Sequence, residues 1–192
     1  APVLTTVSFA ALAAGSALAT PGETTSKSMT QTAPIAAAEA SSAHAIPEAA
    51  GYFASPSDLP FRAPDFTRIS EDDYLPAFEQ GMAIQKAEVR AIIDNPAPPT
   101  FENTIVALEK SGRMLGRVSA VFFALTGSNT TDRLDEINKE ISPKLSAHSD
   151  AILLDPDLFA RVKAVYDNRA AMSMTVEDAR LLEETYADMV HA

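Results

Sequence analysis

The histidines are the residues of this chain best suited to metal binding or general base catalysis. There are three, His44, His148 and His191. A zinc-binding helix carries two histidines four residues apart, as in H-E-x-x-H, so that both rings lie on one face. No second ligand stands three or four residues after His148, and Asp150, two residues away, points to a different face of a helix. We therefore expect His148 to be a half-buried structural residue rather than a metal ligand.

Two pairs of adjacent acidic residues, Asp72-Asp73 and Glu183-Glu184, have the composition of a carboxylate dyad. Both pairs fall at predicted helix ends or faces, where solvated charge explains them better. The chain has no cysteine, which excludes disulfides, thiolate zinc sites and thiol nucleophiles. The patterns G-x-S-x-G, G-x-x-x-x-G-K-[ST] and G-x-G-x-x-G are also absent. The residues thus predict no catalytic residue and no metal ligand, and they leave any substrate-binding residue unknown.

Charge and composition exclude nucleic acid as a partner. The 192 residues contain 15 Lys and Arg against 26 Asp and Glu, a net charge of −11. A surface that follows phosphates shows the opposite balance, and with no Trp and 7% aromatic residues little is available to stack on bases. Hydrophobic residues make up 46% of the chain, which is enough for one ordinary packed domain.

The first 57 residues are expected to lie outside the folded domain. Residues 1–19 form an apolar, uncharged run that ends in Ala17-Leu18-Ala19, the A-x-A pattern of a signal peptidase site, although a basic region before it is missing. The run is too short to act as a stable membrane anchor. Residues 20–57 are rich in Ala, Thr, Ser and Pro, which predicts a flexible leader with His44 exposed to solvent. The expected signal peptide predicts a periplasmic or secreted protein.

Residues 58–192 show helical spacing and no sustained alternation, so the fold class is all-α. Capping residues precede each apolar stripe. The expected caps are Ser70, Thr100, Thr131 or Asp132, Asp155 and Thr175. The expected helices span about 74–94, 101–126, 132–152, 156–166 and 176–190.

Several finer expectations follow from this helical assignment. Gly112 and Gly116 lie one turn apart, which favours close approach of a neighbouring helix. On the third helix, the pairs Asp135–Lys139 and Glu140–Lys144 have the spacing of ion pairs. On the last helix, an inward stripe is expected at Ala179, Leu182, Tyr186, Met189 and Val190. 

Two features suggest helices that need further partners. The second half of the 101–126 helix is apolar nearly all round, which is typical of a helix buried on two sides. The last helix ends at His191-Ala192 without a terminating Gly, Asn or Pro. We therefore expect residues 58–192 to leave an apolar patch exposed when they stand alone.

Five segments of the chain resemble, in order, the N-terminal region of the M3 zinc metallopeptidases. The first contains Y-L-P-A-F-E-Q-G-M at residues 74–82, and no segment alone would be specific. The matching segments are 69–82, 99–112, 117–123, 140–150 and 158–162. Among subfamilies the resemblance is to the bacterial peptidyl-dipeptidase type and to oligopeptidase A.

The resemblance implies a larger helical enzyme with a deep channel that cleaves short peptides and is monomeric at full length. It also implies a zinc site made of an H-E-x-x-H helix and a further Glu, in which the first Glu activates the metal-bound water. That motif lies far downstream of the segments matched here, so no ligand or catalytic residue is carried onto this chain. Residues 58–192 then correspond to an N-terminal helical domain that forms a wall of the channel and is truncated before the catalytic part.

Two functions remain open from the sequence. The first is an N-terminal fragment of an exported zinc peptidase that removes dipeptides from, or cleaves within, short oligopeptides; the fragment alone would bind no zinc and be inactive. The second is a stand-alone, acidic, helical periplasmic interaction module without catalysis. The residues by themselves support only an acidic helical domain.

Overall fold

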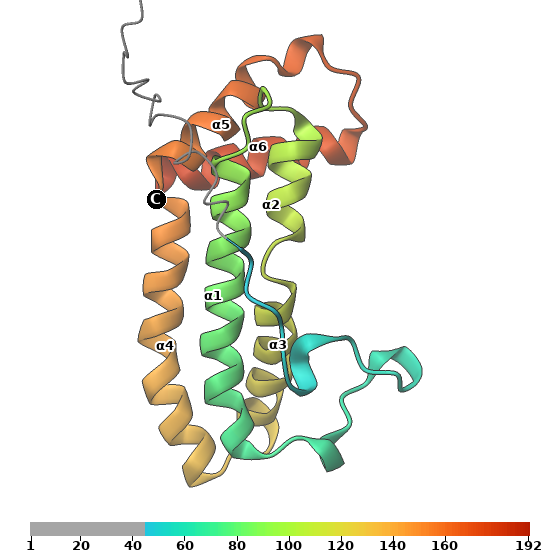
Figure 1. Cartoon of the computed structure of the whole chain (residues 1–192), viewed down its shortest axis with the longest axis vertical. Coiled ribbons are helices and arrows are strands. Elements are labelled where there is room, and N and C mark those ends of the chain that lie inside the picture. The colour runs from blue at the N-terminus through green and yellow to red at the C-terminus, as the bar shows by residue number, and fades with distance from the viewer. Residues whose placement is uncertain (1–44) are drawn as a thin grey trace, which may run out of the picture. The chain divides into compact units, whose positions relative to one another are not determined.

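The computed structural model describes residues 45–192, which form helices and connecting segments with no strand among them (Figure 1). The all-α prediction is confirmed for this part of the chain. The predicted signal peptide at 1–19, and residues 20–44 of the predicted leader, lie outside the described residues. The α-helices are α1 (Tyr74–Ile93), α2 (Ala107–Lys110), α3 (Arg113–Ser128), α4 (Asp132–Leu153), α5 (Pro156–Asp167) and α6 (Val176–His191).

The helices begin where side chains satisfy free backbone N–H groups. Before α1, the carboxylate of Asp73 accepts a hydrogen bond from the Ser70 N–H at 2.7 Å, and Ser70 Oγ accepts one from the Asp72 N–H. Thr131 caps α4 and Asp155 caps α5 in the same way, and Thr175 caps α6. The predicted caps are therefore confirmed, because each one replaces a partner that the first helical turn lacks.

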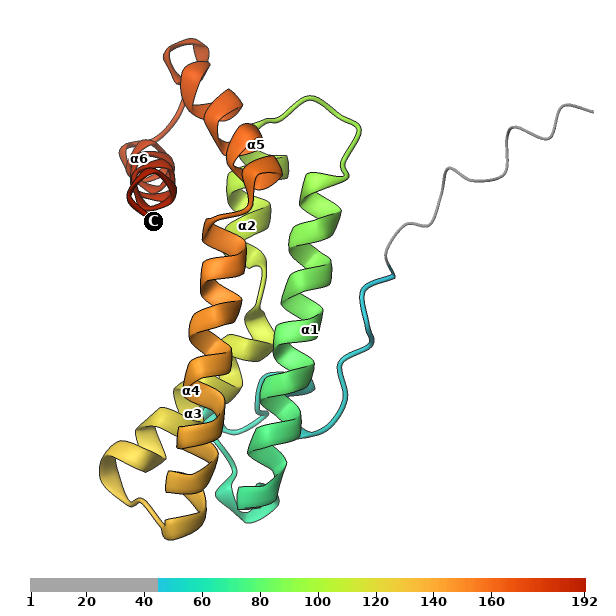
Figure 2. The same ribbon diagram turned by 90° about the vertical axis from the view of Figure 1, so that its left-hand side faces the viewer.

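Helices α1, α3 and α4 lie side by side, while α5 and α6 gather at the end of α1 that carries Ile93 (Figure 1). Figure 2 shows α6 end-on, so α6 crosses the direction of α1 instead of continuing the bundle. Between α1 and α2 the chain passes through the loop 94–100 and a π-helical turn, Phe101–Val106. Short 3-10 turns precede α1 and connect α5 to α6.

Two apolar clusters stabilise these helices, and α1 contributes to both. The first lies among α1, α3 and α4. Its buried members are Phe53, Tyr74, Ala77, Phe78, Ile84, Met114, Val118, Phe122, Leu134, Ile137 and Ile141. The second lies among the C-terminal end of α1, the turn 101–106, α5 and α6. Its buried members are Val89, Ile92, Phe101, Ile105, Leu158, Val162, Val165, Leu182 and Met189.

The prediction of one continuous helix over 101–126 is wrong. Ser111 is extended, Gly112 is left-handed with φ +67°, and α3 starts directly after it. The Gly112 N–H donates to Glu88 Oε2 on α1 at 2.7 Å, so the break is tied to the neighbouring helix. After the break the buried face of α3 is Met114, Val118 and Phe122, whereas Phe123 is 43% exposed.

The close approach expected at Gly112 and Gly116 occurs at a different glycine. A Cβ at Gly81 of α1 would lie 3.0 Å from the Leu115 Cα, so Gly81 lets α1 and α3 pack backbone to backbone. Gly112 instead supplies the left-handed turn, and nothing lies within 4 Å of a Cβ built at Gly116. Glycine is therefore required by a close approach at Gly81 and by a left-handed backbone at Gly112, whereas neither requirement applies at Gly116.

Substituting alanine at Gly112, which precedes α3, and at Gly116, within α3, is expected to have opposite effects. Gly112→Ala should lower the free energy of unfolding by about 1–2 kcal/mol, because a Cβ is unfavourable at positive φ and would overlap the Gln85 amide. Gly116→Ala should raise it by up to about 1 kcal/mol, because alanine is the better helix former and the space is open. Urea unfolding of both variants measures the difference; effects of equal sign would contradict it.

The predicted leader ends earlier than residue 57. Residues 45–57 pack against the helices, with Phe53 only 3% exposed in the first apolar cluster. The Gln80 amide of α1 donates to the Glu48 carbonyl and accepts from the Ala50 N–H. The flexible assignment is therefore wrong for residues 45–57, because the aromatic pair Tyr52-Phe53 provides apolar surface that the rest of the stretch lacks.

Two further details differ from the predicted patterns. Val190, expected on the inward stripe of α6, is 50% exposed, whereas Leu182 and Met189 are buried as predicted. The predicted pair Glu140–Lys144 forms at 2.9 Å. The carboxylate of Asp135, expected to pair with Lys139, instead accepts a hydrogen bond from Thr130 Oγ1 at 2.7 Å.

Candidate functional site

The histidine singled out by the sequence lies on α4 and faces α1. His148 is half-buried, as predicted, and its Nε2 lies 2.8 Å from Gln85 Oε1. Burial lowers the pKa of His148, and the nearby positive charge of Lys86 lowers it further. Asp150 is exposed on another side of the helix. His191 is exposed at the end of α6, and His44 lies outside the described residues.

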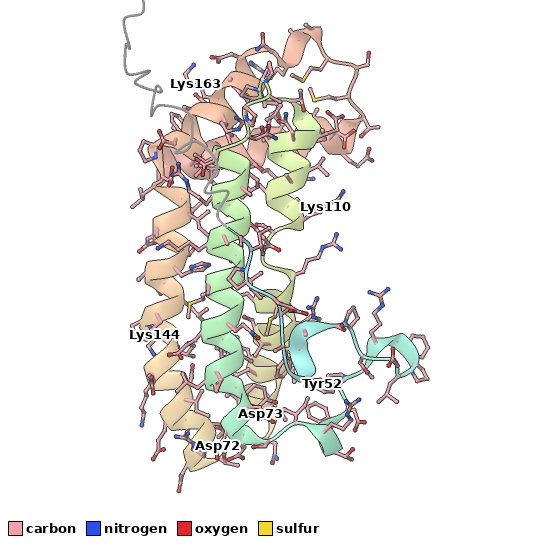
Figure 3. All side chains as sticks on the ribbon, in the orientation of Figure 1. Tyr52, Asp72, Asp73, Lys110, Lys144 and Lys163 are labelled. Carbon is pink, nitrogen blue, oxygen red and sulfur yellow. The ribbon has the colours of Figure 1, made fainter. Side chains whose placement is uncertain are left out.

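The adjacent acidic residues serve in caps and surface ion pairs (Figure 3). Asp72 lies 2.9 Å from the guanidinium of Arg133, while Asp73 belongs to the cap of α1. On α6, Glu184 pairs with Arg180 at 2.8 Å and Glu183 is exposed. Neither pair is enclosed as an acid–base dyad would be.

The family resemblance implies zinc, which side chains of His, Cys, Asp and Glu would have to hold. Within residues 45–192, no three His, Cys, Asp or Glu side chains lie together in a way that could hold a metal ion. This part of the chain therefore does not fit a zinc site.

In the same residues, no helix is both long and apolar enough to cross a membrane.

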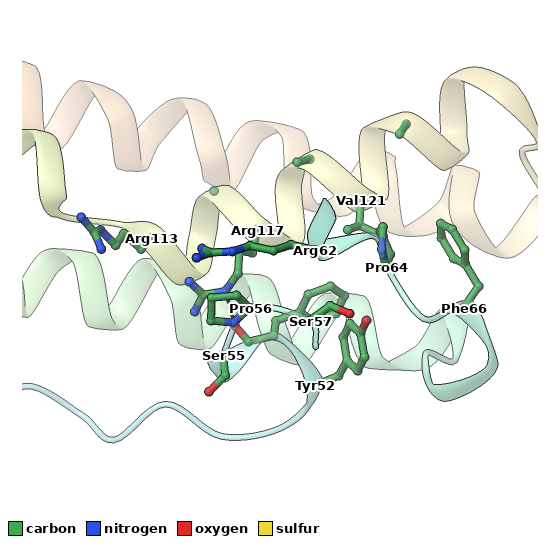
Figure 4. A pocket seen from close by; sticks show the side chains of 14 residues that line it. Tyr52, Ser55, Pro56, Ser57, Arg62, Pro64, Phe66, Arg113, Arg117 and Val121 are labelled. Carbon is green, nitrogen blue, oxygen red and sulfur yellow. Dashed lines mark hydrogen bonds between the residues drawn. The ribbon is translucent and has the colours of Figure 1, made fainter. Parts of the chain in front are cut away.

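A groove of about 910 Å³ lies between α3 and the segment 52–66. We call it the arginine groove, because Arg62, Arg113 and Arg117 line it and none of its lining residues is acidic. Figure 4 shows Arg62 and Arg117 extending along the groove toward the end of α3 that carries Arg113. The remaining lining residues are Tyr52, Phe53, Ser55, Pro56, Ser57, Pro64, Phe66, Gly116, Ala120, Val121 and Ala124.

Arg117 holds the N-terminal wall of the arginine groove in place. Its Nε donates to the Phe53 carbonyl at 2.9 Å, and one terminal nitrogen donates to the Ala54 carbonyl at 2.6 Å. Burial lowers the pKa of Arg117, and the like charge of Arg113 lowers it further. The hydroxyl of Tyr52 accepts a hydrogen bond from the Asp65 N–H at 2.6 Å, which closes the segment 52–65 into a loop.

Removing the guanidinium of Arg117 should release this wall. We expect Arg117→Met to lower the free energy of unfolding by about 1.5–3 kcal/mol, since two charge-assisted hydrogen bonds are lost. Amide hydrogen exchange over residues 50–57 should become faster. Arg113→Met is the matched control, because Arg113 donates no hydrogen bond within residues 45–192. Unchanged protection of residues 50–57 in Arg117→Met would show that Arg117 does not hold them.

A second groove, of about 850 Å³, lies between α1 and α4 and is lined by Lys86, Lys144 and His148 among others. Its charge is largely compensated, because Lys144 lies 2.8 Å from Glu79 and 2.9 Å from Glu140, and Asp155 also lines it. The arginine groove differs in that three arginines line it and no acidic residue does, whereas Asp155 lines the second groove beside Lys86.

Sequence reasoning predicted no substrate-binding residue and did not find the arginine groove. Its walls come from residues about 60 positions apart in the chain, one of them in the segment assigned to the leader. The local signals were the aromatic pair Tyr52-Phe53 in a stretch otherwise rich in small residues, and the two cations Arg113 and Arg117 one turn apart.

Comparison with known proteins gives two bacterial relatives. The dipeptidyl carboxypeptidase of Salmonella typhimurium is 42% identical over 136 residues, which are 71% of this chain and 20% of the relative. The dipeptidyl carboxypeptidase of Escherichia coli is 43% identical over 136 residues, with the same shares. No family profile matches the chain. The chain thus spans about one fifth of the length of these relatives, and the predicted relationship is confirmed: this chain is related in sequence to the bacterial dipeptidyl carboxypeptidases.

Proposed function

We propose that this chain is the N-terminal part of an exported zinc peptidase that removes dipeptides from short peptides or cleaves within them. The observation that carries the proposal is the 42–43% identity to two dipeptidyl carboxypeptidases over 136 residues. In this proposal the zinc ligands and the residue that activates water lie in polypeptide outside this chain, which spans 20% of each relative. When bound there, zinc would polarise the peptide carbonyl and activate water.

In this proposal residues 45–192 build one wall of the channel that admits peptides, and they are inactive alone. The helices supply a firm surface because α1 joins both apolar clusters. The longer enzyme would be a monomer in the periplasm or outside the cell, with short peptides as its partners.

The test compares two purified proteins, this 192-residue chain and the longer polypeptide encoded by the same reading frame. We expect the longer polypeptide to release dipeptides from a blocked tetrapeptide and to lose this activity with a chelator. The 192-residue chain should release none and retain no zinc after dialysis. Both proteins are assayed at equal molar concentration, with product identified by mass spectrometry.

Three results would contradict the proposal. One is chelator-sensitive dipeptide release by the 192-residue chain itself. Another is a longer polypeptide that lacks H-E-x-x-H and shows no peptidase activity. The third is a natural stop codon directly after Ala192, which would favour a stand-alone interaction module.

A further inference from the structure

The positive charge of the arginine groove has no partner among residues 45–192. Arg62 and Arg113 form no ion pair there, and Arg117 is bonded to peptide carbonyls, which carry no net charge. Elsewhere in the same residues five cations are paired with carboxylates, namely Arg90, Arg133, Lys144, Lys163 and Arg180, and the other unpaired cations do not gather in one groove as these three arginines do. In a chain of net charge −11, three arginines without an acidic neighbour in one groove indicate a ligand that brings negative charge.

The α3 wall of the groove is shaped to accept another helix. Gly116, Ala120 and Ala124 are exposed, one turn apart, and nothing lies within 4 Å of a Cβ at Gly116. The other side of α3 already makes such a contact, because a Cβ at Gly81 of α1 would lie 3.0 Å from the Leu115 Cα. A second row of small residues on the uncovered side allows a helix to approach at a similar separation.

Next to the opposite wall, just before Arg62, an apolar side chain is exposed at a conformational cost. Phe61 and Arg62 both have positive φ, 59° and 57°, although neither is glycine. The side chain of Phe61 is fully exposed, and Phe66, which lines the groove, is 53% exposed. Strained non-glycine residues of this kind cluster at ligand clamps and switch regions, which is consistent with a contact made by this segment.

We propose that the arginine groove is the docking surface for an acidic helix from the part of the longer polypeptide that follows this chain. The inference rests on the proposed function, because it requires that polypeptide to exist. The relatives are about five times as long as the matched residues, so a longer polypeptide of this kind has ample chain to cover this face. Carboxylates of the helix pair with Arg62 and Arg113 while its small-residue side lies on Gly116 and Ala120.

The test measures how accessible the α3 wall is in the two proteins. The chain contains no cysteine, so Ala120→Cys introduces one thiol whose maleimide labelling is followed on its own peptide by mass spectrometry. We expect labelling in the longer polypeptide to be at least about tenfold slower than in the 192-residue chain. Ser149→Cys, at an exposed position of α4 away from the groove, is the control and should label at the same rate in both.

A charge reversal tests the complementarity. In the longer polypeptide, Arg113→Glu should speed labelling at Ala120→Cys about fivefold or more, because it repels the acidic helix. Lys110→Glu makes the same charge change on α2 outside the groove and should leave the rate unaltered. Equal acceleration by both variants would show that only net charge matters and would overturn the docking surface.

The remaining outcomes separate this inference from the proposed function. If Ala120→Cys is labelled at the same rate in both proteins, the inference is overturned. Dipeptide release by the longer polypeptide would in that case still support the proposed function. Protection without dipeptide release supports the inference and contradicts the proposed function. Labelling of the 192-residue chain that slows with its own concentration identifies a second copy as the occupant. If a short peptide with a free carboxylate slows labelling of the 192-residue chain, the groove binds peptides. Occupation by a second copy or by a peptide would each overturn the proposal of a docked helix.

Discussion

Phe122→Ala is expected to lower the free energy of unfolding by about 3–5 kcal/mol, the usual range for deleting a fully buried aromatic ring. Phe122 has no exposed surface, and its ring centroid lies 5.2 Å from those of both Tyr74 and Phe78. The loss combines the transfer free energy of the ring with the cavity left between α1 and α3. Urea unfolding followed by circular dichroism measures it.

The neighbouring Phe123 provides the matched control. It has the same side chain on the same helix but is 43% exposed, so Phe123→Ala should cost much less than Phe122→Ala. Equal losses at the two positions would show that burial in the first apolar cluster does not set the stability of α3.

Leu182→Ala should destabilise the second apolar cluster by about 2–5 kcal/mol. Leu182 is fully buried and brings α6 against α5 and the turn 101–106. Because α6 crosses one end of α1, the largest loss of amide protection is expected in α5 and α6. Hydrogen exchange read by mass spectrometry distinguishes this local effect from global unfolding.

Val176→Ala is the control for the second apolar cluster. Val176 begins α6 and is 83% exposed, so its substitution should change the free energy of unfolding by no more than about 0.5 kcal/mol. If Leu182→Ala reduced protection equally in α3 and α4, the two apolar clusters would unfold as one unit and the local prediction would be wrong.

The starts of the helices were predictable because capping is local chemistry. Ser70, Thr100 and Asp155 each accept hydrogen bonds from N–H groups two or three residues ahead, so sequence spacing alone reveals them. The all-α class followed from the same helical spacing. These predictions required no knowledge of which helices touch.

The break before α3 was not predictable from the apolar spacing, because that spacing continues through it. Leu108 and Leu115 are seven residues apart, as on one face of a continuous helix, yet Gly112 between them is left-handed. The break depends on the hydrogen bond from Gly112 to Glu88 of α1, a contact between residues 24 positions apart. A lone glycine in a helical pattern does not indicate which role it plays.

The arginine groove was beyond sequence reasoning for a similar reason. Arg113 and Arg117 are visible as two cations one turn apart, but their significance depends on residues 52–66 lying against α3. Composition assigned part of that segment to a leader, since Tyr52 and Phe53 are too few to produce a periodic pattern. The contacts of Arg117 with Phe53 and Ala54 become apparent only in three dimensions.

Two arginines hold loops through backbone carbonyls, and this choice of acceptor makes the contacts insensitive to acid. Arg117 donates to the carbonyls of residues 53 and 54, and Arg161 donates to those of Asn95 and Ala97. A carboxylate partner is lost when it takes up a proton, but a peptide carbonyl remains an acceptor over the whole range in which carboxylates titrate. Acidification should therefore weaken the ion pairs between carboxylates and cations on the helix surfaces first, while both loops stay fastened to their helices.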